Sequence, residues 1–260
     1  MIDALVGSAT DVGCVRQLNE DAVLTAPGLF IVADGMGGHA AGEVASALAL
    51  EQLRVLVGRD DVRPEDLAAA VDQANTTILG VAAEHEEAAG MGTTVTGLCL
   101  GKVGGSPHWF VFNVGDSRVY RFSDSELVQV TVDHSEVEEL VAAGLISAAD
   151  ARHHPRRNVV TRSLGSDPAP TPDIWVLPAT PGESFIVCSD GLTSEVDDDQ
   201  IAAELSRGAP AQETADALVA MANDAGGHDN ISVIVVRVAG GSAGEADIAT
   251  APRNGLATGS

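Results

Sequence analysis

The chain has 260 residues and a hydrophobic share of 45%, which is enough for a sizeable buried core, although only 3% of its residues are aromatic. Its formal net charge of -24 argues against nucleic acid as a partner, because proteins bind phosphate backbones with clustered Lys and Arg. A phosphorylated substrate would need a local group of cations, either metal ions or arginines, to overcome this negative field.

Hydrophobic patterning in the first half of the chain predicts many strands and two long helices. The apolar run 29–33 is typical of a buried strand. Residues 40–57 predict a mostly buried helix, because their polar residues form only one narrow stripe. Pro64, with acidic residues in the turn after it, opens a second helix that fades in the acidic stretch 84–87. Further strands are predicted, in chain order, at 23–25, 93–100, 108–114, 118–122 and 126–132.

The second half of the chain predicts a short helix at 135–143 and an irregular, mobile surface segment at 144–173. Further elements follow in chain order: strands at 174–177 and 184–189, helices at 197–207 and 211–225, and a last strand at 231–238. Beyond residue 239 the chain is rich in Gly, Ala, Ser and Thr, so we expect one domain over 1–239 and a disordered tail over 240–260. Short strands with helix pairs in both halves predict an α+β fold in several layers.

Cys14, Cys99 and Cys188 are odd in number and far apart, so neither a disulfide framework nor a zinc site is indicated. We expect all three to be packing residues, and Cys188 lacks the Arg six positions later that a cysteine phosphatase needs. The N-terminus lacks the basic start and apolar run of a signal peptide. No segment approaches the ~18 consecutive apolar residues of a membrane span. We therefore expect a reduced, cytoplasmic protein with no membrane partner.

Four aspartates stand where predicted strands end or begin, each beside a Gly, Ser or Asn that lets the chain turn: Asp34, Asp116, Asp190 and Asp229. Any one of them alone is more often a turn residue than a ligand. If the strand ends meet, however, so many carboxylates cannot all stay ionised without cations. Carboxylate, carbonyl and water ligands suit Mg²⁺ or Mn²⁺, and two such ions together would activate water and hold phosphoryl oxygens.

Eight short motifs follow one another across residues 16–232. They are Arg16 with Glu20-Asp21; Asp34-Gly35-Met36-Gly37-Gly38-His39; Gly92-Thr93-Thr94; Asn113-Val114-Gly115-Asp116-Ser117-Arg118; Asp133-His134-Ser135; Thr161-Arg162-Ser163-Leu164-Gly165; Cys188-Ser189-Asp190-Gly191-Leu192; and Asp229-Asn230-Ile231-Ser232. With these motifs in this order, the chain resembles the metal-dependent protein serine/threonine phosphatases of the type 2C class, in their compact bacterial form.

This resemblance implies a four-layer α-β-β-α sandwich, with two antiparallel sheets between helix pairs. It also implies two Mn²⁺ or Mg²⁺ ions and a third, more weakly held ion. Asp34 would bridge the first two ions, and Gly35 would give its carbonyl to one of them. Arg16 would grip the substrate phosphate with its guanidinium fork. Asp190 and Asp229 would bind the other ion. Glu20 or Asp21 would hold the second ion, directly or through water. Asp116 would hold the third ion together with Asp190.

The implied mechanism is attack on phosphorus by a metal-bound hydroxide, with no covalent intermediate. Some family members carry a His, as general acid, directly after the Asp-Gly pair. Met36 occupies that position here, so protonation of the leaving alkoxide would fall to a metal-bound water. His39, at the expected start of a helix, is predicted to be structural or outer-shell. The stretch 144–173 falls where this family carries a flap beside the site.

The other polar candidates have plainer explanations. We expect Arg118 to be a structural ion-pair partner, His228 to be solvated, and His134 to touch the surroundings of the site. The histidines and arginines at 153–157 could read acidic or phosphorylated substrates, although a solvated flap is the simpler account. Serines beside the aspartates have no His placed to make them nucleophiles.

The sequence thus predicts a Mg²⁺- or Mn²⁺-dependent phosphatase for phosphoserine and phosphothreonine in proteins. We expect a monomer whose substrates are Ser/Thr kinases and their targets. One alternative is a phosphatase that switches a sigma-factor cascade, although the chain leaves no room for the sensor domain usual in those enzymes. The other is an inactive scaffold that binds phosphoproteins, against which the retention of Asp34, Asp190, Asp229 and Arg16 argues.

Overall fold

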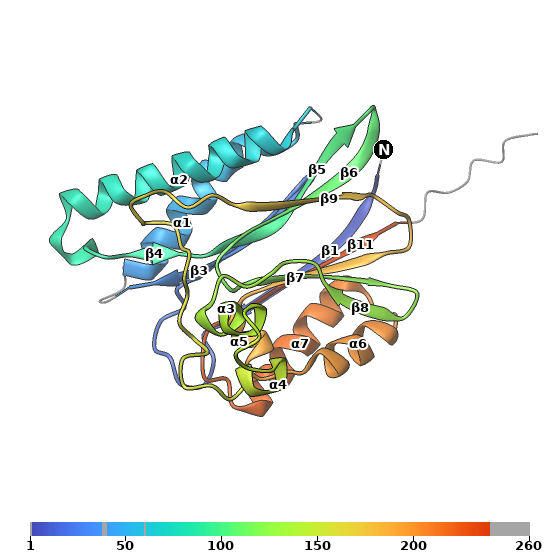
Figure 1. Ribbon diagram of the computed structural model, residues 1–260. Helices are drawn as coiled ribbons and strands as arrows, with labels where there is room; N and C mark the ends of the chain where they lie inside the picture. The colour runs from blue at the N-terminus through green and yellow to red at the C-terminus, as the bar shows by residue number, and fades with distance from the viewer. Residues whose placement is uncertain (1, 38–40, 60, 240–260) are drawn as a thin grey trace, which may run out of the picture.

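The computed structural model describes residues 2–37, 41–59 and 61–239, and its elements form a sandwich of four layers (Figure 1). Two β-sheets lie face to face in the middle, and a helix pair covers the outer face of each. This is the α-β-β-α arrangement that the family resemblance implied, and the prediction of fold class is confirmed. The expected tail at 240–260 and the role expected for His39 lie outside the described residues.

Both sheets are built from antiparallel neighbours. The first sheet has, in spatial order, β1 (Ala4–Asp11), β11 (Ile231–Val238), β10 (Ser184–Cys188), β7 (Arg118–Ser123) and β8 (Glu126–Gln129). The second has β2 (Asp21–Ala26), β3 (Leu29–Met36), β5 (Val95–Val103), β6 (Ser106–Val114) and β9 (Asp173–Pro178), with the short β4 (Gly92–Thr93) paired to β3.

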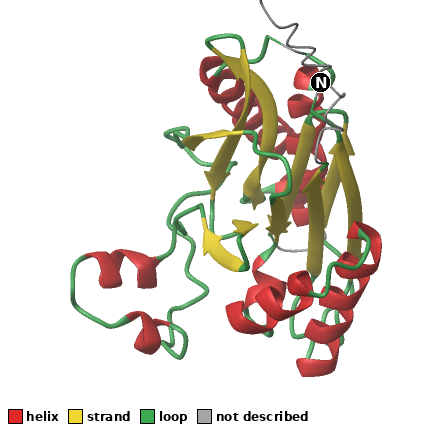
Figure 2. Cartoon of the chain, turned by 90° about the vertical axis from the view of Figure 1, so that its right-hand side faces the viewer, coloured by secondary structure: helices red, strands yellow, loops and turns green. Residues whose placement is uncertain are grey.

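The helices fall into two covering pairs and a small lobe. Helices α1 (Ala41–Leu53) and α2 (Pro64–Glu84) pack on the second sheet, and α6 (Asp198–Ser206) and α7 (Ala211–Ala225) on the first. Figure 2 shows the short helices α3 (Glu136–Ala142) and α4 (Ala148–Ala151) in a lobe that projects from one end of the sandwich. The remaining pieces are α5 (Asp190–Thr193) and the 3₁₀ turns η1 (Arg54–Leu56) and η2 (Glu86–Ala88).

Strand β3 shows why the central strands are apolar on both faces. Leu29, Ile31 and Ala33 pack toward α1 and α2, whereas Phe30 and Val32 pack between the two sheets. Side chains alternate along a strand, so a strand covered on both sides needs a continuous apolar run. The next residue facing the space between the sheets, after Val32, is the aspartate at position 34.

The structure also corrects several predicted boundaries. Strand β1 was not predicted, because its small and polar residues give little pattern, and its pairing with β11 creates it. The strands predicted at 93–100 and 108–114 extend toward each other and leave a turn of only Gly104 and Gly105, whose positive φ angles of 58° and 84° suit a tight hairpin. The helix expected at 40–57 ends as an α-helix at Leu53 and continues as η1. The segment 144–173, predicted to be irregular, contains α4.

Candidate active site

Carboxylates from four separate segments meet at one end of the sandwich. Asp21 opens β2 and lies directly opposite Asp34 in the β2–β3 ladder, so both side chains share one face of the sheet. Asp190 is the first residue of α5, directly after β10 and Ser189. Asp116 follows β6 and is buried. Asp229 directly precedes Asn230 and β11, and its charge acts on both Asp34 and Asp190. The four aspartates expected to meet at strand ends, Asp34, Asp116, Asp190 and Asp229, therefore lie together, and Asp21 joins them.

The pKa values of these carboxyl groups show that they share one buried, negatively charged environment. Burial raises the pKa of Asp21 to about 7. Burial, followed by the charge of Asp190, raises the pKa of Asp116 to about 8. Burial and then the charge of Asp229 raise the pKa of Asp190 to about 6. Burial and then the charges of its neighbours raise the pKa of Asp34 well above its usual value.

The Gly92-Thr93-Thr94 motif holds the backbone of Asp34 in place. The Thr94 hydroxyl accepts a hydrogen bond from the Asp34 backbone N–H at 3.0 Å. The Thr93 hydroxyl and the Thr94 N–H both donate to the Asp34 carbonyl, each at 2.9 Å. Because both polar backbone groups of Asp34 are bound, its side chain is fixed at the end of β3.

The structure separates the roles of Glu20 and Asp21, which the sequence left open. The Glu20 carboxylate accepts the backbone N–H of Gly42 at 3.1 Å, in the first turn of α1. The Asp21 carboxylate lies in the acidic cluster, where Oδ2 accepts the Ser189 hydroxyl at 2.7 Å. Its other oxygen, Oδ1, is buried and has no hydrogen-bond partner. Of the two neighbours, Asp21 is therefore the one placed to act as a ligand.

Arg16 lies beside the cluster on the β1–β2 loop. Its Nη2 contacts Asp229 Oδ2 at 2.7 Å, and its side chain is 51% exposed. Asn230 holds both ends of this loop, because its side-chain amide donates to the carbonyls of Val12 and Leu18 at 3.0 and 2.9 Å. Arg16 thus presents a guanidinium group to solvent at the edge of the carboxylates.

The carboxylate cluster fits a hard divalent cation by donor type and charge. All of its donors are oxygens, the ligands that Mg²⁺ and Mn²⁺ prefer, and the unpartnered Asp21 Oδ1 is an acceptor buried without a proton donor. The pKa values of Asp21 and Asp116 are raised, and a bound cation would lower them, because a nearby positive charge favours the ionised carboxylate. Within the described residues, no three Asp, Glu, His or Cys side chains form a complete ligand group as they stand.

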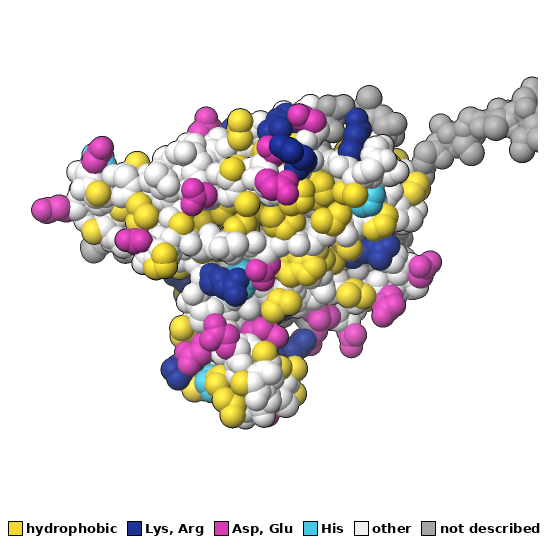
Figure 3. All heavy atoms as spheres, turned by 45° about the horizontal axis from the view of Figure 1, so that its top comes forward, with side chains coloured by type: hydrophobic (Ala, Val, Ile, Leu, Met, Phe, Trp, Pro, Cys, Tyr) yellow, Lys and Arg dark blue, Asp and Glu magenta, His cyan; other side chains and the backbone are white. Residues whose placement is uncertain are grey.

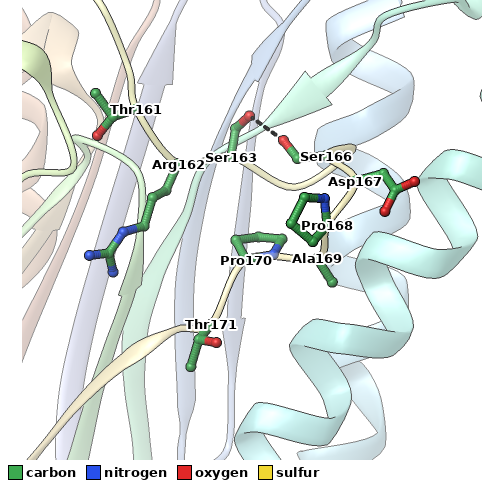
Figure 4. A pocket seen from close by; sticks show the side chains of 9 residues that line it. All are labelled: Thr161, Arg162, Ser163, Ser166, Asp167, Pro168, Ala169, Pro170 and Thr171. Carbon is green, nitrogen blue, oxygen red and sulfur yellow. Dashed lines mark hydrogen bonds between the residues drawn. The ribbon is translucent and has the colours of Figure 1, made fainter.

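A cavity of 820 Å³ lies between the cluster and the projecting lobe. Asp116 and Asp190 are on one wall, and Arg152, His153 and Arg157 of the segment 144–173 are on the other. A separate hollow of 580 Å³ runs along residues 161–171 beside α2 (Figure 4), and it contains none of the clustered carboxylates. The first cavity is therefore the one that could bring a substrate to the carboxylates.

The space-filling view shows acidic side chains spread over the visible face, with basic side chains in small groups (Figure 3). Several of the described arginines are paired with acids, such as Arg152 with Asp197 and Arg156 with Glu136. Arg152 and Arg156 are therefore both already paired with acidic side chains of this chain. No helix of the described chain is both long and apolar enough to span a bilayer.

The structure agrees with the prediction for Arg118 and agrees only in part with that for His228. Arg118 binds both carboxylate oxygens of Asp133 and donates to the Tyr120 hydroxyl, which confirms a structural ion pair. His228 was expected to be solvated; its side chain is 73% exposed, yet Nδ1 also contacts Glu195 at 2.6 Å.

The three cysteines are free thiols in two different settings. Cys99 and Cys188 are buried, as predicted, and burial raises the pKa of each thiol to about 12. A thiol with so high a pKa is a poor nucleophile, which argues against a cysteine phosphatase. The prediction for Cys14 was wrong: it is exposed, because it lies on the β1–β2 loop rather than under a sheet.

Ser and Thr residues that had no predicted role hold the carboxylates in place. Ser189 binds Asp21, and its hydroxyl also accepts the backbone N–H of Ser232 at 2.9 Å. Thr94 binds both Asp34 and the hydroxyl of Ser117. Ser117, Ser189 and Ser232 stand in the same motifs as acids, and that adjacency was a signal, whereas the motif of Thr94 contains no acid.

Comparison with known proteins gives one consistent result. The family model described as protein phosphatase 2C matches residues 15–231. The serine/threonine phosphatase stp of Listeria welshimeri is 36% identical over 243 residues, which cover 87% of this chain and 93% of that protein. The serine/threonine protein phosphatase PstP of Mycobacterium tuberculosis is 39% identical over 235 residues, which are 88% of this chain and 44% of PstP.

A solved structure has the same architecture. The crystal structure of the catalytic domain of PstP, in complex with two manganese ions, matches with a TM-score of 0.84 and 33% identity, over 92% of this chain and 100% of that one.

Proposed function

The chain belongs to the protein phosphatase 2C family, and on this basis we propose that it hydrolyses phosphoserine and phosphothreonine in proteins with the help of divalent cations. The observation that carries the proposal is the convergence of Asp21, Asp34, Asp116 and Asp190 on one buried point beside Arg16. The named relatives, which are serine/threonine phosphatases, support the reaction class, and the manganese ions of the PstP domain support the cofactor.

The cluster would hold Mn²⁺ or Mg²⁺ through the carboxylates of Asp34, Asp190 and Asp229, the carbonyl of Gly35, and Asp21 rather than Glu20. Asp116 would contribute to a further, weaker site. When bound, such ions would lower the pKa of water, so that hydroxide is available near neutral pH, and would offset charge on phosphoryl oxygens. The remaining steps depend on the protein's own side chains.

Arg16 would bind the phosphate of the substrate. Its fork can donate two parallel hydrogen bonds to two phosphoryl oxygens, and its exposure leaves it accessible from solvent. Its partner Asp229 holds the guanidinium group at the edge of the cluster. A substrate phosphate would then be aligned before attack, and charge that develops on it would be stabilised by a cation already in place.

Water would be the nucleophile, and the reaction would need no covalent intermediate. Ser189 is occupied by Asp21 and by the backbone of Ser232, with no imidazole near enough to bond it in the described structure. Met36, in the position directly after Asp34 and Gly35, has no proton to donate. The proton for the leaving alkoxide would therefore come from water.

We propose phosphorylated proteins, including Ser/Thr kinases and their targets, as the substrates. The cytoplasmic location and the monomeric state expected from the sequence stay predictions.

The test uses three synthetic phosphopeptides of one sequence, carrying phosphoserine, phosphothreonine or phosphotyrosine. We expect phosphate release from the first two with Mn²⁺ or Mg²⁺, and loss of activity in EDTA. Full activity in EDTA would refute the metal dependence, and preference for phosphotyrosine would refute the substrate class. Binding of the phosphopeptides without hydrolysis would favour an inactive scaffold.

A further inference from the structure

His134 is buried and joined to the turn that carries Asp116. Its side chain is 5% exposed. The ring Nδ1 accepts the backbone N–H of Gly115 at 3.0 Å, and the His134 backbone N–H donates to the Gly115 carbonyl at 2.8 Å. Gly115 has a φ of 118°, a backbone conformation that favours glycine, so the turn before Asp116 needs glycine at this position. His134 therefore holds both polar backbone groups of the residue before Asp116.

The other side of His134 is joined to the end of the segment 144–173, which we call the flap segment. The ring Nε2 contacts Asp173 Oδ2 at 3.0 Å, at the point where the flap segment enters β9. The His134 carbonyl accepts the backbone N–H of Thr161 at 2.8 Å. Arg162, one of the residues that line the 580 Å³ hollow (Figure 4), donates to Asp173 Oδ1 at 3.2 Å, and its Nη1 lies 3.1 Å from His134 Nε2.

The two ring nitrogens of His134 have separate tasks. A backbone N–H can only donate, so Nδ1 must be the acceptor toward Gly115, and the proton of a neutral ring is then on Nε2, facing the Asp173 carboxylate. One imidazole thus joins the Asp116 turn to the flap segment. The 820 Å³ cavity lies between the same two parts, with Asp116 on one wall and Arg152 of the flap segment on the other.

We propose that His134 is a positioning residue with two separate joints: one ring nitrogen holds the turn that carries Asp116, and the other holds the end of the flap segment that walls the cavity. The proposal rests on the proposed function only for the cation site. The link itself is a property of the folded chain and is testable without substrate.

Two substitutions separate the two halves of the link. His134→Asn keeps an acceptor near the position of Nδ1 and cannot reach Asp173. His134→Gln places its amide near the position of Nε2 and leaves the Gly115 N–H without its acceptor. His108→Asn is the matched control, because His108, among the described residues, bonds the nearby carbonyl of Ser106 on the β5–β6 hairpin and reaches neither Gly115 nor Asp173. Asp173→Asn changes a residue that is 40% exposed, so it tests the flap half without disturbing the core.

Two readouts are measured on the full chain. The first is the rate of trypsin cleavage after Arg152, Arg156 and Arg157 in EDTA, followed by mass spectrometry. The second is Mn²⁺ binding by calorimetry. We expect His134→Asn and Asp173→Asn to speed cleavage about tenfold, the change that loss of one charge-assisted hydrogen bond gives, with Mn²⁺ binding unchanged. We expect His134→Gln to weaken the weakest Mn²⁺ site about tenfold with little change in cleavage.

Several results would overturn the proposal. One is that His134→Asn and His134→Gln change neither readout more than His108→Asn does. Another is that each of the two variants changes both readouts equally, which would mean a general loosening rather than two separate joints. Circular dichroism identifies a variant that has failed to fold, and in that case the cleavage result for Asp173→Asn decides. Because cleavage is measured in EDTA and without substrate, it stays informative even if the chain hydrolyses no phosphopeptide.

Discussion

Replacing Asp21 by Asn should make the metal-free protein more stable and the enzyme inactive. The Asp21 carboxylate lies opposite Asp34 in the β2–β3 ladder and has one buried oxygen without a partner. Its pKa rises from 3.8 to about 7, because burial outweighs the hydrogen bonds that it accepts from Ser189 and Ser232. At about 1.36 kcal/mol per pKa unit, ionised Asp21 destabilises the metal-free fold by about 4 kcal/mol above neutral pH.

The sign follows from the direction of the shift. A carboxyl group with a raised pKa contributes its full stability below pH 3.8 and loses it as the pH rises through about 7. An amide at position 21 has no charge to lose, so the advantage of Asp21→Asn should grow over this range. A domain of this size gains about 2–4 °C in Tm per kcal/mol, and an amide still costs something to bury, so we expect a rise of about 5–10 °C at pH 8.

The assay is differential scanning calorimetry of metal-free protein in EDTA at pH 5 and pH 8. The increase in Tm at pH 5 should be less than half of that at pH 8. Asp72→Asn, on the exposed face of α2, is the control and should change Tm little at either pH. With Mn²⁺ present, Asp21→Asn should gain less stability than the wild type, because it lacks a ligand. A lower Tm than wild type in EDTA at pH 8, or equal shifts at both pH values, would refute the reasoning.

Three further substitutions test single parts of the site. Asp34→Asn should abolish phosphopeptide hydrolysis with unchanged circular dichroism, because the backbone bonds of Asp34 to Thr93 and Thr94 survive; wild-type turnover would contradict its role as a ligand. Arg16→Ala should lower kcat/KM about tenfold to a hundredfold through loss of a charge-assisted phosphate contact, and an unchanged value at saturating Mn²⁺ would exclude it from phosphate binding. Gly35→Ala should destabilise the fold by about 2–3 kcal/mol in urea unfolding, because its Cβ would collide with the backbone carbonyls of Gly42 and Glu20. Gly80→Ala, which meets open space on α2, is its control and should be neutral or stabilising.

Local patterns predicted most of the fold. Buried strands such as β3 and β10 are continuous apolar runs, because layers cover both of their faces, and an aspartate at the end of such a run is visible without any structure. Strand β1 was missed for the opposite reason. Its residues carry little hydrophobic pattern, and only the ladder with β11, more than 200 residues later in the chain, makes it a strand.

The candidate site divides in the same way. The residues Asp34, Asp116, Asp190 and Asp229 were identified from the sequence, because a strand end followed by a turn is a short-range signal. The sequence could not decide whether Glu20 or Asp21 faces the other carboxylates, because neighbouring side chains point to opposite sides of the chain. The pairing of Asp21 with Asp34 in the β2–β3 ladder shows that it is Asp21.

The amino-acid sequence by itself determined that this chain carries carboxylates at strand ends and an arginine upstream, in the order of one phosphatase family. Only the tertiary structure decided how they are held. Ser189 supports Asp21, the threonines support Asp34, and His134 joins the Asp116 turn to Asp173 at the end of the flap segment. These contacts link residues far apart in the chain, and their geometry is set by the packing of the two sheets, which no local pattern records.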